Sequence, residues 1–137
     1  MASVEDVYLR RFTPLVPPAR SEVWTWFFMR LSGLVLVFLV LGHMAIMHVL
    51  DGGVEKVNFS FVAARWTGAF WRSYDWLLLA LALLHGAIGA RVVIRDHIHG
   101  TRWAKLAVVT LYSITALLLL LGTVVIVTFD ASQMPGA

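Results

Sequence analysis

The chain has 137 residues, of which 60% are hydrophobic and only 14% charged, and a water-soluble domain of this size could not keep so much apolar surface from solvent. It contains no cysteine, which excludes disulfides, thiolate metal sites and cysteine-ligated iron–sulfur clusters within the chain. The composition therefore predicts a membrane protein.

The N-terminal segment, residues 1–23, lacks an apolar core and contains three prolines, which cannot lie inside a helix. We expect an irregular tail on the cytoplasmic side rather than a cleaved signal peptide. The first membrane-spanning helix must then direct insertion.

Three long runs without charged residues follow this segment. They are Leu31 to Leu50, Trp76 to Ala90 and Leu106 to Phe129. About 20 apolar residues cross the hydrocarbon core, so the first and third runs suffice, and the second does if Arg91 extends its head toward the interface. The runs and their flanks predict transmembrane helices over about 24–50, 73–96 and 102–129. The fold class is an all-α membrane protein, with the three-helix region covering residues 24–130.

The connections between these helices differ in character. The first begins at Asp51-Gly52-Gly53, which ends helix one, and residues 58–74 are rich in Phe, Trp and Tyr. Such a belt is typical of a membrane interface, and we expect a short interfacial helix there. The second connection is a short basic turn through Gly100, and residues 131–137 form a short tail.

Basic residues are distributed unequally between the two sides of such a three-helix protein. One side holds Arg10, Arg11, Arg20, Arg30, Arg91, Arg95, Arg102 and Lys105, and the other holds Lys56, Arg65 and Arg72. The positive-inside rule therefore favours a cytoplasmic N-terminus and an external C-terminus. The basic character thus reports topology, and we expect no nucleic acid as a partner.

His85 lies near the middle of the second apolar run. An imidazole at membrane depth is costly unless its nitrogens find a ligand or a hydrogen-bond partner, so it is a candidate haem ligand. Gly89 follows on the same helix face and leaves room for a flat macrocycle, and Arg91 lies about 9 Å nearer the inner surface.

His43, in the first helix, is predicted to lie at a different depth from His85. It is about 20 Å of helix beyond Arg30, whereas His85 is about 9 to 16 Å from the inner end. Both axial ligands of one iron face each other across a few ångströms, because metal–nitrogen bonds are about 2 Å long. We therefore expect the second ligand of an iron at His85 to come from another subunit.

Two short motifs in the expected helices carry a family resemblance. Arg30-Leu31-Ser32-Gly33 begins helix one, and His85-x-x-x-Gly89-x-Arg91 with a later Asp96 lies in helix two. Together they resemble the small membrane-anchor subunits of succinate dehydrogenase (respiratory complex II). Of the two kinds of anchor in that complex, the chain is more similar to the D type than to the C type, because the Ser and His that usually precede the motif arginine in the C type are replaced by Trp26 and Met29.

The resemblance implies a set of cofactor-binding residues. His85 would be an axial ligand of haem b, paired with a histidine of a second anchor of the C type, with Ser32 and Gly89 beside it. Arg30 and Arg91 would lie near the haem propionates or the quinone. His43 would bind a second haem, as in di-haem relatives that are often linked to menaquinone.

The same resemblance implies a quinone-reduction site at the inner surface, formed by Asp96, His97, Arg30 and Trp26. The family often has Asp-Tyr where this chain has Asp96-His97, and the tyrosine donates a hydrogen bond to a quinone carbonyl. His97 can serve as donor and proton carrier instead, because histidine changes charge near neutral pH.

Partners and location follow from the same resemblance. FAD would lie in a flavoprotein subunit and the iron–sulfur clusters in an iron–sulfur subunit, since nothing in this chain would hold them. The chain would serve electron transport and the tricarboxylic acid cycle from the cytoplasmic (inner) membrane, without oxidising succinate itself.

Other interpretations stay open at this point. His85 can be a structural residue bonded to a serine or a backbone carbonyl of a neighbouring helix, and the glycines and arginines can serve only for helix packing and anchoring. The chain can also be the cytochrome b anchor of another respiratory dehydrogenase, such as a hydrogenase or formate dehydrogenase, although these usually have four or more helices. A non-redox small membrane subunit is the third possibility.

Overall fold

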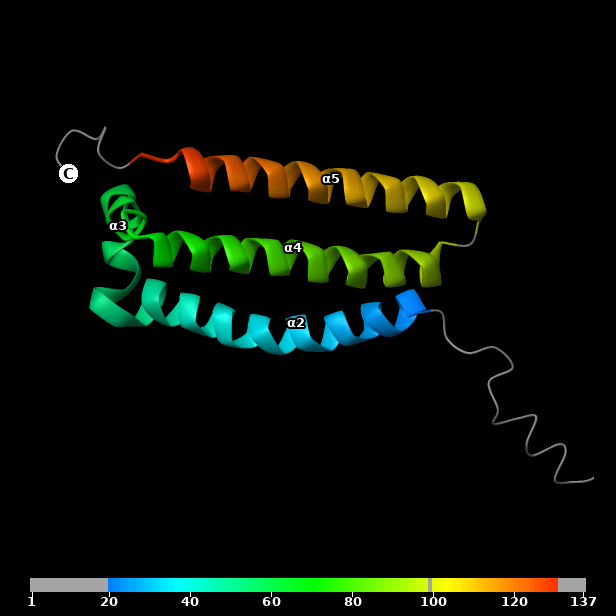
Figure 1. The fold of residues 1–137 in the computed structure, drawn as a ribbon, viewed down its shortest axis with the longest axis horizontal. Coiled ribbons are helices and arrows are strands. Elements are labelled where there is room, and N and C mark those ends of the chain that lie inside the picture. Colours follow the sequence, from blue (N-terminus) through cyan, green and yellow to red (C-terminus); the bar gives the residue numbers. More distant parts are fainter. Residues whose placement is uncertain (1–19, 99, 131–137) are drawn as a thin grey trace, which may run out of the picture.

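The computed structural model describes residues 20–98 and 100–130, and every regular element in these ranges is helical. Three long helices dominate, and shorter helical segments connect the first to the second (Figure 1). The long helices are α2 (Arg20–Met44), α4 (Ala69–His97) and α5 (Thr101–Thr128). The connecting segments are η1 (Ala45–Val49, a π-helical turn), η2 (Leu50–Lys56, a 3₁₀ segment) and α3 (Phe59–Arg65).

Three helical stretches are long and apolar enough to cross a membrane. They are Arg20–Val49, Ala69–His97 and Thr101–Thr128, with 28 to 30 residues each. At 1.5 Å per residue they are about 42 to 45 Å long, so they exceed the hydrocarbon core of about 30 Å and reach the headgroup layers. The prediction of an all-α protein with three membrane-spanning helices is confirmed.

The helix ends differ from the predicted ones by a few residues. α2 begins at Arg20, so residues 20–23 belong to the helix rather than to the expected tail, of which residues 1–19 lie outside the described residues. Proline is tolerated only in the first turn of a helix. A helix that begins at Arg20, just after Pro18, therefore contains no proline in its interior. The regular α-helix gives way at Met44 to the π turn, and Gly52 and Gly53 (φ +101° and +70°) then turn the chain. A short helix, α3, lies in the connection where we expect an interfacial helix, and it is shorter than the aromatic segment.

The long helices form a single row with α4 between α2 and α5 (Figure 1). Small residues allow the close approach of α4 to α5, since Ala80 and Ala87 are buried and a side chain at Gly122 would overlap Leu79. Small residues at helix interfaces are typical of membrane proteins, in which packing rather than hydrophobic burial holds the helices together.

Large apolar side chains remain exposed along all three helices. Phe38 in α2, Val93 in α4 and Val127 in α5 are 70%, 56% and 70% exposed. A contiguous surface of this kind is far larger than a water-soluble monomer carries. The row therefore needs lipid or other membrane helices to cover it.

Candidate functional site

His85 of α4 is held by Ser32 of α2. Ser32 is only 3% exposed, and its Oγ lies 2.9 Å from His85 Nδ1. The same Oγ is 3.5 Å from the carbonyl oxygen of Met29. If the hydroxyl proton points to Met29, the serine oxygen accepts from Nδ1–H, which leaves the lone pair of the ring on Nε2, at the opposite edge. In this tautomer, Nδ1 is a hydrogen-bond donor to Ser32 and Nε2 is an acceptor.

Nε2 of His85 has no hydrogen-bond partner and is not enclosed, among the residues that the structure describes. The ring lies on the wall of a hollow of about 350 Å³, whose other lining residues all come from α2. They are Gly33, Leu36, Val37, Val40 and Leu41. The hydrogen bond to Ser32 alone suits a structural histidine as well as a metal ligand. The open Nε2 beside an apolar hollow, however, has a lone pair that is available to a metal.

Two glycines of the motifs lie close to this ring or one turn from it. A Cβ at Gly33 would come within 3.3 Å of His85 Cε1, a crowded distance, so glycine gives the imidazole its room. A Cβ at Gly89 would meet only Met29 Cε, at 3.9 Å. Gly89 therefore faces α2, and it is Gly33 that lies against the imidazole.

A second hollow, of about 440 Å³, lies between the N-terminal end of α2 and the C-terminal end of α4. It is lined by Trp26, Met29 and Arg30 from α2 and by Ile88 and Arg91 from α4, among others. The Arg30 guanidinium lies over the Trp26 ring at 4.2 Å from its centroid. Arg91 Nε is buried and has no hydrogen-bond partner among the described residues. A cationic donor left unpaired in this way favours an anionic or carbonyl ligand.

Asp96 and His97 do not line that hollow. Both are exposed in the last turn of α4, and His97 Nδ1 is 3.0 Å from the carbonyl oxygen of Val93 in its own helix. Of the residues predicted for the quinone site, the structure thus brings together Trp26 and Arg30, with Arg91 beside them, and leaves Asp96 and His97 one to two turns farther along the helix.

His43 belongs to a separate polar cluster at the other end of α2 and α4. Its Nδ1 is 3.6 Å from Asp75 Oδ1, and Asp75 also accepts a hydrogen bond from Trp66 Nε1 at 2.8 Å. Arg65 Nη2 lies 3.5 Å from the same carboxylate, and its guanidinium stacks on the Trp71 ring. The Asp75 and Arg65 side chains are only 14% and 10% exposed, so the structure buries an ion pair here.

Sequence reasoning missed Asp75 and Arg65 as partners of His43. The signal was present in the antiparallel register of the two helices. Once Ser32 pairs with His85, a residue ten places earlier in α4 must face one about eleven places later in α2, which pairs Asp75 with His43. The same register separates the two histidines by about 15 Å in depth, at 1.5 Å per residue. The two histidines are therefore too far apart to be the two axial ligands of one iron. No cluster of three metal-binding side chains occurs in the described ranges.

A comparison with protein families identifies the chain. Residues 13–129 match the family model described as succinate dehydrogenase/fumarate reductase transmembrane subunit. No curated protein matches the chain. The matched range contains all three membrane-spanning helices, the Ser32–His85 pair and both polar ends of the α2–α4 interface. The chain, a multi-pass membrane protein, therefore belongs to the family of transmembrane subunits of succinate dehydrogenase and fumarate reductase.

Proposed function

We propose that this chain is a D-type membrane anchor of a succinate dehydrogenase, in which His85 binds haem b together with a second, C-type anchor. The observation that carries the proposal is the arrangement of the His85 ring, with Nδ1 held by a buried serine and Nε2 open. Family membership implies partner subunits. A flavoprotein subunit would then hold FAD. An iron–sulfur subunit would hold the clusters, because no cysteine is available here to ligate them.

The residues around His85 fit a haem chemically. Histidine ligands of metals usually donate their second ring N–H to a neighbouring group, which orients the ring and fixes the tautomer, and Ser32 provides such an acceptor. Gly33 leaves the ring its space. The unpaired Arg91 Nε suits a propionate. When bound, haem b would supply a one-electron carrier between the iron–sulfur subunit and the quinone.

The hollow at Trp26, Arg30 and Arg91 is our proposed position for the quinone headgroup, and Trp26 and Arg30 are the residues expected to orient it. Arginine donors polarise a quinone carbonyl, and the indole gives the ring an apolar wall. Asp96 and His97, exposed at the same end of α4, would bring protons to this site from the cytoplasmic surface. Menaquinone is the quinone we propose.

His43 is our proposed ligand for a second haem. Its support is the Asp75 carboxylate, which lies 3.6 Å from Nδ1. This distance is longer than a hydrogen bond, but the carboxylate would attract a proton on Nδ1 and leave Nε2 for iron. At about 15 Å from the depth of His85, such a haem would extend electron transfer toward the outer face. We propose a cytoplasmic N-terminus and the cytoplasmic membrane as the location.

Purification of the complex through a tag on this chain tests the function. We expect a flavoprotein to copurify, a pyridine haemochrome assay to give one or two haems b per chain, and succinate to reduce the haem and a menaquinone analogue. A complex with nickel or molybdenum would support the anchor of another dehydrogenase. A colourless complex would rule out the haem assignment.

Ser32→Ala should leave the haem bound but more weakly, since loss of a group that orients a metal ligand costs about 10- to 100-fold in affinity or activity. We also expect the reduction midpoint potential to rise, because the imidazole becomes a poorer donor to ferric iron. Redox titration of the haem absorbance measures both effects, and Ser32→Thr, which keeps the hydroxyl, serves as control. An unchanged potential and haem content in Ser32→Ala would show that the hydrogen bond is only structural.

A further inference from the structure

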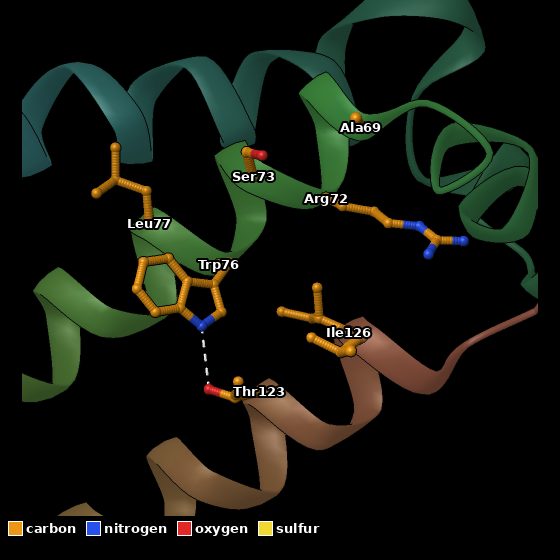
Figure 2. Close-up of a pocket in the computed structure, with 8 residues that line it drawn as sticks. Ala69, Arg72, Ser73, Trp76, Leu77, Thr123 and Ile126 are labelled. Atoms are coloured by element: carbon orange, nitrogen blue, oxygen red, sulfur yellow. Dashed lines mark hydrogen bonds between the residues drawn. The ribbon is translucent and has the colours of Figure 1, made fainter.

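A large groove between the outer ends of α4 and α5 has no role in the proposed function. Its volume is about 740 Å³, within the range of pockets that hold small molecules. Figure 2 shows Trp76 and Leu77 of α4 and Ile126 of α5 on its apolar part, with the Trp76 indole N–H donating to Thr123 Oγ1 at 3.0 Å. Trp76 Nε1 and Thr123 Oγ1 are therefore paired with each other, which suits an apolar chain beside them.

Arg72 lies at one end of the groove, and its guanidinium points away from Trp76 (Figure 2). Nη2 donates to the carbonyl oxygen of Phe129 at 2.9 Å, and Nε donates to the carbonyl oxygen of Trp66. These two bonds hold the cation at the junction of α3, α4 and α5. The position is the first turn of a spanning helix, in a belt of aromatic residues, which is the depth of lipid headgroups.

The charge of Arg72 has no counter-ion within the described part of the chain. Neither salt bridge of these residues includes it, and its Nη1 has no hydrogen-bond partner and is not buried. Ser73, next to it, is exposed and lines the same groove, and its hydroxyl is also unpaired there. A cation fixed at partial burial, with a hydroxyl beside it, favours a phosphate group.

We propose that this groove binds a glycerophospholipid, with the phosphate at Arg72 and Ser73 and one acyl chain along Trp76, Leu77 and Ile126. The profile of the groove, cationic at the headgroup end and apolar toward the membrane centre, is complementary to a phospholipid. A transmembrane helix of a partner would cover the apolar part but leave the Arg72 charge unmatched unless it carried an acid at that depth. The inference does not depend on haem or quinone, because His85 contacts α2 and the groove lies on the α5 side of α4.

The experiment measures phosphatidylglycerol bound to the purified, delipidated complex by native mass spectrometry. We expect saturable binding of phosphatidylglycerol and none of diacylglycerol, which lacks the phosphate. Arg72→Gln should weaken binding about tenfold, the effect of one charge-assisted hydrogen bond. Ala69→Trp should fill the groove and abolish binding while leaving the contacts of Arg72 intact. Arg95→Gln, an exposed arginine at the other end of α4, is the control without effect.

Two results would overturn the proposal. Equal binding in the wild type, Arg72→Gln and Ala69→Trp would show that lipid binds elsewhere. A cysteine placed at Leu77, unique in this chain, would crosslink to another subunit if a partner helix occupies the groove, and efficient crosslinking in the intact complex would assign the groove to that partner. Both readouts are independent of haem content and of quinone reduction.

Discussion

Replacing His85 with alanine is expected to abolish the low-spin absorbance of the haem that we propose His85 binds. The ring supplies the open Nε2, and a methyl group cannot coordinate iron. A single histidine from the proposed second anchor would not hold the haem in a low-spin, six-coordinate state. The reduced-minus-oxidised spectrum of membranes, normalised to the amount of this chain by immunoblot, measures the effect without requiring purification.

Two variants make this result specific. His85→Gly with added imidazole should recover part of the spectrum, since free imidazole can enter the space left by the side chain. His48→Ala should leave the spectrum unchanged, because the His48 side chain is exposed and its ring has no hydrogen-bond partner within the described residues. Full haem absorbance in His85→Ala would mean that the ring is bonded to Ser32 for structural reasons alone.

Of the variants proposed here, Asp75→Leu is expected to lower the free energy of unfolding the most. It would leave the Arg65 guanidinium, 10% exposed, without its counter-ion and would remove the acceptor of the Trp66 indole N–H. Breaking one partner of a buried ion pair costs about 3–5 kcal/mol. Thermal unfolding of the complex in detergent, followed by the α-helical circular dichroism signal, should show a clear decrease in the midpoint temperature.

The double variant Asp75→Leu/Arg65→Met separates the charge from the packing. With both charges removed, most of the lost stability should return, because a buried ion pair is often replaceable by apolar side chains. Glu55→Gln, at an exposed acid in the connection between α2 and α4, should change stability by less than about 0.5 kcal/mol. If Asp75→Leu behaved like Glu55→Gln, the cluster would carry little of the stability.

Much of the fold could be predicted from the distribution of charges. The absence of charged residues from Leu31 to Leu50 and from Leu106 to Phe129 identifies two helices, since a helix satisfies its backbone hydrogen bonds within one continuous apolar segment. The π turn at Ala45–Val49 could not be predicted, because the residues there are as apolar as those before them. Helix ends are also set by contacts: the carbonyl group of Phe129, at the end of α5, accepts from Arg72 in α4.

The site was predictable in part, for a similar reason. His85 is recognisable from its position alone, and Ser32 from the motif at the start of α2. The pairing of His43 with Asp75 depends on the register between two helices, which is a tertiary property. Asp96 and His97 lie near Arg91 in sequence, but the helix carries them beyond the hollow that Arg91 lines.

The single-row arrangement of α2, α4 and α5 has a consequence for how cells make this protein (Figure 1). Each helix satisfies its own backbone, so the chain can enter the bilayer alone, before it meets any other polypeptide. With two broad apolar sides open, however, it would remain partly uncovered whenever the partner subunits implied by its family are scarce. We therefore expect its synthesis to be matched to that of its partners, and unassembled copies to be removed by membrane proteases.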